Sequence, residues 1–257
     1  MTRFTLRRYA NLSCAILLGL STAPATLLAA EADFANTRAR LEMAMEGPTR
    51  TPAEIARDFT ERKPVETLEF FRFRHDMNVL ELIPGAGWYT KLLGPTVRGS
   101  GKLHVAINTD TVEQQLLNQP GFDEVSVLRL PEGMNLRNLE DFQFDVKDLD
   151  LVLTFRNLHN LSAQNRAVLN KAVYDSLKPG GLYGIKDHTR RHMEGDTREN
   201  GRRLDPVLVI KELLDAGFEF VDYSNLHASP IDGLTLEVGD ETVTGQTDRF
   251  TLLFRKP

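Results

Sequence analysis

The sequence predicts an α/β protein: a Rossmann-like, seven-stranded, mostly parallel sheet with helices on both faces and an antiparallel last strand. Three observations predict this fold. Apolar segments of strand length alternate with helical segments from residue 78 onward, which is typical of a parallel sheet covered on both faces. The first strand ends in a glycine-rich turn, where open α/β sheets bind ligands. The last two strands are joined through a loop over 229–248, as expected before an antiparallel strand.

The individual elements follow from the spacing of the apolar residues. The expected strands are 78–82, 102–107, 125–130, 149–155, 181–186, 218–223 and 249–255. The expected helices between them are 89–97, 111–118, 162–177 and 205–216. No internal repeat interrupts this order, so we expect one α/β domain over 61–257.

A helical N-terminal extension is expected over 31–60, where charged residues mix with Ala, Leu and Met. A Gly- and Pro-containing turn over 47–52 interrupts it. Thr51 followed by Glu54 has the spacing of a helix cap. A further helix is expected to begin at Pro64, because proline is favourable at the first helical position.

The first thirty residues have the layout of a secretory signal peptide. Three arginines precede an apolar run over 11–20, and no acid occurs before Glu31. A retained membrane anchor is the alternative, but the run is shorter than the ~20 residues that a spanning helix needs, and Pro24 interrupts its continuation. We therefore expect residues 1–30 to be a signal peptide and the protein to be exported, with no stable membrane insertion after cleavage.

Composition limits the possible chemistry and partners. Cys14, the one cysteine, lies in the expected signal peptide, so the mature chain would have no disulfide and no thiolate nucleophile. Loss of residues 1–30 removes three arginines and no acids, which changes the net charge from −5 to −8 and disfavours a nucleic-acid partner. No metal is expected, because His188 and His192 are four residues apart but the second lies beyond the expected strand. The sequence carries no signal for an oligomeric state.

The turn after the first strand is the strongest functional signal. Glu81 lies at the end of the strand, and Gly85 and Gly87 follow before a helix begins. Glycines let a backbone approach a ligand, and a helix N-terminus offers free amides. We interpret this segment as a ligand-binding turn, with a purely structural turn as the alternative. The dinucleotide pattern G-x-G-x-x-G fits less well, because Thr90 occupies the third glycine position.

The second strand ends about twenty residues beyond this turn, at Asn108 and Asp110. Nucleotide-binding α/β domains place an acid there, whose carboxylate accepts the ribose hydroxyls. Asn108 or Asp110 is therefore a candidate for ribose binding. The alternative for Asp110 is a cap of the helix that follows.

The fourth expected strand is followed by the polar residues Arg156, Asn157 and His159. They fall at the same edge of the sheet as the glycine-rich turn, so Asn157 and His159 are candidates for substrate binding. His159 could also act as a general base, because the ordinary pKa of histidine lies near neutrality. The alternative is that His159 and Asn160 only cap the next helix.

The fifth expected strand leads to Asp187 and His188 at the same edge. Adjacent strand residues point to opposite faces, so only one of the two is expected to face the ligand and a direct Asp187–His188 dyad is not expected. The basic segment 190–203 that follows is expected to be a solvated loop, with a cover over an acidic substrate as the alternative.

These motifs, in this order, resemble those of the class I S-adenosylmethionine-dependent methyltransferases. The matching segments are Glu81-x-x-x-Gly85-x-Gly87, the Asn108 to Asp110 region, the strand 149–155 with Asp148 before it, and Leu177-Lys178-Pro179-Gly180-Gly181. Ile83 stands where family members often carry another glycine. More narrowly, Glu-Leu-x-Pro-Gly-x-Gly-Trp-Tyr-Thr and Leu-Thr-Phe-Arg-Asn-x-His-Asn resemble a group of exported bacterial predicted methyltransferases.

The resemblance implies a cofactor, S-adenosyl-L-methionine, and transfer of its methyl group to a small-molecule acceptor. The amino-acid end of the cofactor would lie against Gly85 and Gly87 near Glu81, and its ribose near Asn108 or Asp110. The catalytic candidates on the acceptor side are Asn157, His159 and Asp187. The alternative function is a non-catalytic envelope binding module that keeps the fold.

Overall fold

The computed structural model describes residues 25–257, with side-chain surroundings from Phe34 onward. Most of the expected signal peptide, residues 1–24, lies outside the described residues. The strands are β1 (Asn78–Leu82), β2 (Lys102–Ala106), β3 (Ser126–Leu128), β4 (Leu149–Phe155), β5 (Leu177–His188), β6 (Glu219–Ser224) and β7 (Arg249–Arg255). All seven expected strands are present, and β1, β4 and β7 have the expected bounds.

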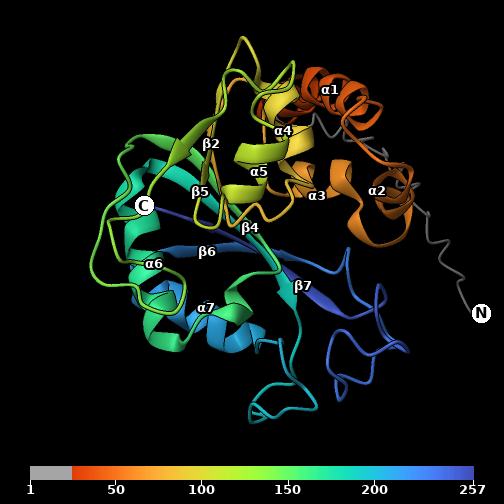
Figure 1. The fold of residues 1–257 in the computed structure, drawn as a ribbon, viewed down its shortest axis with the longest axis vertical. Coiled ribbons are helices and arrows are strands. Elements are labelled where there is room, and N and C mark those ends of the chain that lie inside the picture. The colour runs from red at the N-terminus through yellow and green to blue at the C-terminus, as the bar shows by residue number, and fades with distance from the viewer. Residues whose placement is uncertain (1–24) are drawn as a thin grey trace, which may run out of the picture.

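The strands form one sheet in the order β3-β2-β1-β4-β5-β7-β6 (Figure 1). Pairs from β3 through to β5 are parallel, whereas β7 is antiparallel to both β5 and β6. The expected fold class is therefore confirmed, including the antiparallel last strand.

The helices of the described chain surround this sheet. They are α1 (Ala25–Met45), α2 (Pro52–Arg57), the π-helical turn η1 (Asp58–Arg62), α3 (Pro64–Phe70), α4 (Thr90–Val97), α5 (Asp110–Gln115), the 3₁₀ turn η2 (Leu158–Asn160), α6 (Ala163–Ser176) and α7 (Pro206–Asp215). The expected cap of α2 is confirmed, since the Thr51 and Glu54 side chains each accept a hydrogen bond from the other residue's backbone N–H.

Side chains alternate between the two faces of the sheet and bury a core on each. In β4, Leu151 and Leu153 belong to the core under α3 and α4, together with Leu68. Val152 belongs to the opposite core, together with Leu169 of α6. Figure 1 shows this division, with α1, α3, α4 and α5 on one side of the sheet and α6 and α7 on the other.

The start of β5 differs from the expectation. The expected helix ended at Leu177 and a turn separated it from a strand at Gly181, but β5 already begins at Leu177. Leu177 pairs with Leu149, and the next pair joins Leu182 to Leu151, so residues 178–181 bulge out of the ladder. The Pro-Gly-Gly signal therefore marks a bulge within a strand instead of a turn before one.

Most of the basic segment 190–203 is exposed, as expected of a solvated loop, but Arg190, Asn200 and Arg203 are buried. The Arg203 side chain is buried and donates hydrogen bonds to both carboxylate oxygens of Asp232, at 2.8 and 3.1 Å. It also donates to the carbonyls of Thr189 and Leu236. This buried ion pair fastens the segment to the loop that leads into β7. Among the described residues, no helix is both long and apolar enough to span a bilayer.

Gly184 of β5 lets α3 and the residue after it pack closely on the sheet. A Cβ at this position would lie 2.7 Å from the ring of Phe71 and 2.9 Å from Leu153. We expect Gly184→Ala to lower the free energy of unfolding by about 1–3 kcal/mol, the usual cost of overpacking a core. Urea denaturation measures this change.

The matched control is Gly195→Ala, where a Cβ meets no atom within 4 Å. We expect this variant to unfold at the same urea concentration as the wild type. Equal midpoints for both variants would show that α3 does not depend on close contact with β5.

Candidate functional site

The strand order reverses between β1 and β4, and a cavity of about 310 Å³ opens where these strands end. Such switch points are where open α/β sheets bind ligands. Three segments form the cavity: the turn after β1, the loop after β4, and the N-terminal elements α2 and η1. The lining residues are Glu54, Arg57, Arg62, Glu81, Ile83, Pro84, Gly85, Ala86, Trp88, Tyr89, Phe155, Arg156 and Asn157.

The two glycines of the turn have different surroundings. Gly85 has φ +60°, and a Cβ there would meet nothing within 4 Å, so this position faces open space in the cavity wall. Gly87 has φ +76°, and a Cβ there would lie 3.1 Å from the side chains of Val112 and Leu116. Gly85 therefore keeps the cavity open, whereas Gly87 allows the turn to pack on α5.

Left-handed backbone conformations gather at this edge of the sheet. Ile83, Ile107 and Arg156 each follow a strand directly and have φ of +55°, +68° and +63°. A β-branched residue seldom adopts this conformation, and such strain is typical of functional sites. Ile83 thus keeps the backbone shape that a glycine would adopt at its position.

Glu81 is a buried acid in the cavity wall. Its carboxylate accepts a hydrogen bond of 2.7 Å from the Thr90 hydroxyl, and burial raises its pKa to about 7. The side chain therefore changes charge near neutral pH. A cation bound beside it would favour the ionised form.

The candidates at the end of β2 lie outside the cavity lining. Asn108 and Asp110 are both exposed, and Asn108 has φ +53°. Asp110 is the first residue of α5, and the residue before it, Thr109, caps this helix without a side-chain hydrogen bond to its backbone. The alternative role of Asp110 as the helix cap is therefore not seen.

Asn157 joins the ends of the two strands that flank the cavity. Its side-chain amide donates to the carbonyl of Ile83 at 3.0 Å and to that of Phe155 at 3.1 Å. The residue lines the cavity, as expected of a substrate-binding candidate. It also holds the rim of the cavity in one arrangement.

The structure brings His159 and Asp187 together. The Nδ1–H of His159 donates to the Asp187 carboxylate at 2.6 Å, and the backbone N–H of His159 donates to its other oxygen at 3.1 Å. The side chains are 6% and 0% exposed. The pair lies outside the cavity lining, and Nε2 of His159 has no hydrogen-bond partner among residues 34–257. The cap of the next helix is Ser162, not His159.

His188 points to a different partner. Its Nδ1 lies 2.8 Å from the Thr247 hydroxyl, and burial together with the charges of Arg249 and Arg156 lowers its pKa. Its ring centroid is 5.7 Å from that of His159. Among residues 25–257, no group of three or more His, Cys, Asp or Glu side chains is placed to hold a metal ion.

Aromatic rings form one wall of the cavity. The rings of Tyr89 and Phe155 stack with centroids 3.5 Å apart, and Trp88 packs against Tyr89 at 4.6 Å. The guanidinium groups of Arg50 and Arg62 lie 5.0 and 4.8 Å from the centroid of the Trp88 ring. These cation–π contacts connect the N-terminal elements to the turn after β1.

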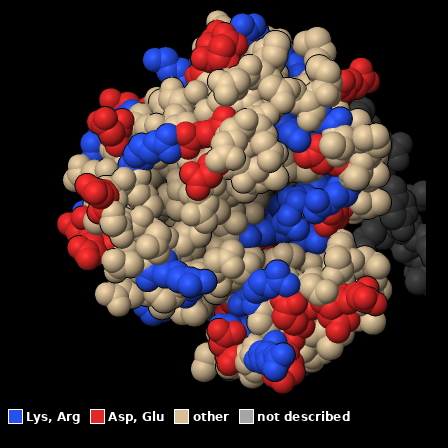
Figure 2. Space-filling model, viewed as in Figure 1, with Lys and Arg blue, Asp and Glu red and all other residues tan. Residues whose placement is uncertain are grey.

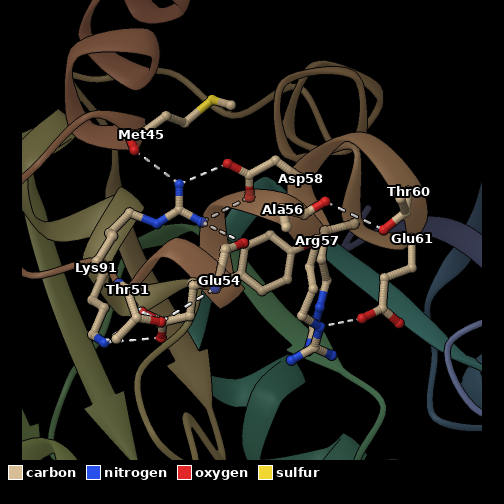
Figure 3. A network of polar contacts seen from close by, with 12 residues as sticks. Met45, Thr51, Glu54, Ala56, Arg57, Asp58, Thr60, Glu61 and Lys91 are labelled. Atoms are coloured by element: carbon tan, nitrogen blue, oxygen red, sulfur yellow. Dashed lines mark hydrogen bonds and ion pairs between the residues drawn. The ribbon is translucent and has the colours of Figure 1, made fainter.

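A polar network fixes α2 and η1 in place (Figure 3). The buried guanidinium of Arg50 donates to both oxygens of Asp58 at 2.7 Å. Lys91 of α4 donates to the Glu54 carboxylate at 2.9 and 3.0 Å. The N-terminal extension is therefore part of the site and not a separate appendage.

Sequence reasoning missed the contributions of Arg62, Trp88 and Tyr89. The two aromatic residues directly follow Gly87, so their position in the turn was a usable signal. Arg62 had no local signal, because a helix and a strand separate it from the turn.

Lys186 lies buried behind the aromatic wall. Its ammonium group is 2.9 Å from the Tyr89 hydroxyl and 3.3 Å from Nε2 of His227. Burial and the nearby charges of Arg62 and Arg249 lower its pKa well below the ordinary value. The region behind the cavity is therefore rich in basic groups.

Comparisons with known proteins identify the fold. No family model matches the chain, and no curated protein matches its sequence. An S-adenosylmethionine-dependent methyltransferase from Aquifex aeolicus matches with a TM-score of 0.56 and 18% identity, over 86% of this chain and 98% of that one. The glycopeptide N-methyltransferase MtfA complexed with S-adenosyl-L-homocysteine has a TM-score of 0.52 and 15% identity, over 82% and 100%. The [4+2]-cyclase SpnF has a TM-score of 0.51 and 16% identity, over 82% and 85%.

The pKa of Glu81 predicts a pH-dependent stability. The folded protein keeps the proton up to about pH 7, whereas an unfolded chain releases it near 4.5. The free energy of unfolding should therefore fall as pH rises from about 4.5 to about 7, by about 3 kcal/mol in total. Glu81→Gln removes this dependence, so its stability should exceed that of the wild type at pH 8 and match it near pH 4.5.

Urea denaturation at pH 5, 6, 7 and 8 measures the difference. The exposed Glu132→Gln serves as the control variant. If the stability advantage of Glu81→Gln were the same at every pH, the proposed protonation of Glu81 would be wrong.

Proposed function

We propose that this protein transfers a methyl group from S-adenosyl-L-methionine to a small-molecule acceptor. The observation that carries the proposal is the cavity at the β1–β4 switch point, with Gly85 facing open space and the buried Glu81 beside it. The fold supports it, since MtfA with the same fold has been crystallised with S-adenosyl-L-homocysteine.

The residues around the cavity fit this cofactor. The missing side chain at Gly85 lets the amino-acid end of the cofactor approach the backbone of the turn. The ionised form of Glu81 suits the ammonium group of the cofactor. Asn108 and Asp110, which follow the neighbouring strand β2, are the candidates for binding the ribose of the cofactor. Gly87 lets the turn after β1 pack closely on α5, the helix that follows β2. When bound, the cofactor supplies a methyl group on a positively charged sulfur.

The protein's own contribution is to position the acceptor and to remove a proton from it. Asn157 would orient the acceptor at the cavity rim. His159 would take the proton on Nε2, and Asp187 would hold the ring in the tautomer that carries its hydrogen on Nδ1. The proposal includes export to a bacterial periplasm, on the basis of the basic head and the apolar run in residues 1–30.

The cofactor assignment is tested by calorimetric titration of the purified protein with S-adenosyl-L-homocysteine. We expect micromolar binding to the wild type and at least a hundredfold loss in Gly85→Val, because the new side chain would fill the open space of the cavity wall. Gly99→Val is the matched control. Gly99 also has a positive φ and open space around its Cβ, but it precedes β2 at the opposite edge of the sheet.

Absence of binding to the folded wild type would exclude this cofactor. An equal loss of affinity in Gly85→Val and Gly99→Val would show that backbone strain causes the loss, and not filling of the cavity. Binding without methyl transfer to any acceptor would favour the envelope binding module.

The role of His159 is tested by transfer of a labelled methyl group to a small-molecule extract. We expect His159→Ala and His159→Asn both to reduce the rate by about 10²–10⁴-fold, the usual contribution of a general base. The Asn side chain can still donate to Asp187 and hold the loop, but it cannot accept the proton. The control His192→Ala removes another His–Asp pair, with Asp205, whose histidine is exposed and lies in the segment 190–203 instead of the loop after β4.

Recovery of the rate in His159→Asn would contradict a proton-transfer role, because it would show that His159 only anchors the loop. Binding of S-adenosyl-L-homocysteine to each variant is measured alongside and should change by less than about threefold.

A further inference from the structure

The cavity is surrounded by more basic than acidic groups. Arg57, Arg62 and Arg156 line it, and Figure 2 shows Lys and Arg side chains gathered in a hollow between α2 and β7. Glu61 lies outside the cavity lining, and it already binds Arg57 and, at 3.0 Å, Arg249. One carboxylate is thus shared between two guanidinium groups.

Arg62 and Arg156 are left without an anionic partner. Within residues 34–257, no carboxylate lies within ion-pair distance of either guanidinium, and no oxygen accepts a hydrogen bond from either side chain. Arg62 is only 5% exposed, and the Nε atoms of both arginines are buried without a partner. The indole Nε1 of Trp88, in the same wall, is also buried and unpaired.

The other acids of the cavity do not neutralise these charges. Glu81 is bonded to Thr90 and holds its proton up to about pH 7, and Glu54 is bonded to Lys91. Burial and the neighbouring Arg156 lower the pKa of Arg62 to about 9, so the group still carries its charge at neutral pH. Buried charges without partners are costly, which makes a bound anion favourable here.

The two arginines reach the cavity from different elements, and the charge of Arg156 is near enough to lower the pKa of Arg62. Arg62 comes from η1 and lies over Trp88, whereas Arg156 comes from the loop after β4, beside Asn157. The two groups can therefore bind one anion together, and the adjacent aromatic wall of Tyr89 and Phe155 suits an apolar body attached to that anion.

We propose that the methyl acceptor is a small organic anion whose carboxylate or phosphate binds the Arg62–Arg156 pair while its apolar part packs on Trp88, Tyr89 and Phe155. This inference rests on the proposed methyl transfer and names the class of acceptor. Carboxylate and phosphate can each accept two parallel hydrogen bonds from a guanidinium group, so the experiment includes both.

Calorimetric titration of the full-length protein, saturated with S-adenosyl-L-homocysteine, tests the proposal. The probes are benzoate, phenyl phosphate and the neutral benzyl alcohol. We expect at least one anion to bind tenfold or more tightly than benzyl alcohol. The fluorescence of Trp88, the one tryptophan of the chain, provides a second readout inside the cavity.

Arg156→Gln and Arg62→Gln should each weaken anion binding at least tenfold and leave benzyl alcohol unchanged. Arg156→Lys should recover part of the affinity, because it keeps the charge. Arg137→Gln, an exposed arginine outside the cavity lining, is the control. Thermal unfolding checks that each variant folds, and if Arg62→Gln fails to fold, the Arg156 variants decide.

Two results would overturn the inference. One is that neither anion is preferred over benzyl alcohol. The other is that the anions bind with methylthioadenosine but not with S-adenosyl-L-homocysteine, which would assign both arginines to the cofactor carboxylate. Failure of the proposed function looks different, because S-adenosyl-L-homocysteine itself would not bind. If the protein does not bind S-adenosyl-L-homocysteine but still binds anions through these arginines, the anion site is supported and the methyl donor is not.

Discussion

Because β2 lies along one edge of β1 and β4 along the other, the segments that follow β1 and β4 leave the sheet in opposite directions. Parallel strands end at the same edge, so the space between these segments cannot be filled by either of them. The side-chain amide of Asn157 bridges the gap at its base by donating to the carbonyls of Ile83 and Phe155. The cavity, its aromatic wall and the N-terminal elements that cover it all depend on this topology.

Several energetically unfavourable features of the fold lie at this same edge of the sheet. Left-handed Ile83 and Ile107, the neutralised Glu81 and the unpaired guanidinium of Arg62 each cost stability. The two apolar cores on the faces of the sheet and the buried Arg50–Asp58 pair offset these costs. Unfavourable features gathered at one edge of the sheet are better explained by ligand binding than by folding, since a core gains nothing from them.

The sequence predicted the sheet well because each strand is a short apolar run between clear breaks. It predicted the start of β5 poorly, because a Pro-Gly-Gly segment signals a turn and only pairing with β4 turns it into a bulge. Single residues at the strand ends could be predicted from position alone, but the contact between His159 and Asp187 joins residues 28 apart and depends on strand register. Arg62 could not be predicted at all, since its place over Trp88 is decided by packing of the N-terminal extension.

The fold alone does not decide the reaction, since proteins as different as the methyltransferase MtfA and the cyclase SpnF share it. The sheet and the Gly85 turn form the part of the cavity that suits a nucleoside-containing cofactor. The remaining walls come from α2, η1 and the loop after β4, which contribute Arg57, Arg62 and Arg156. Segments outside the strands therefore bring the charges to this cavity, and the chemistry of the second ligand is decided by these segments and not by the sheet that carries them.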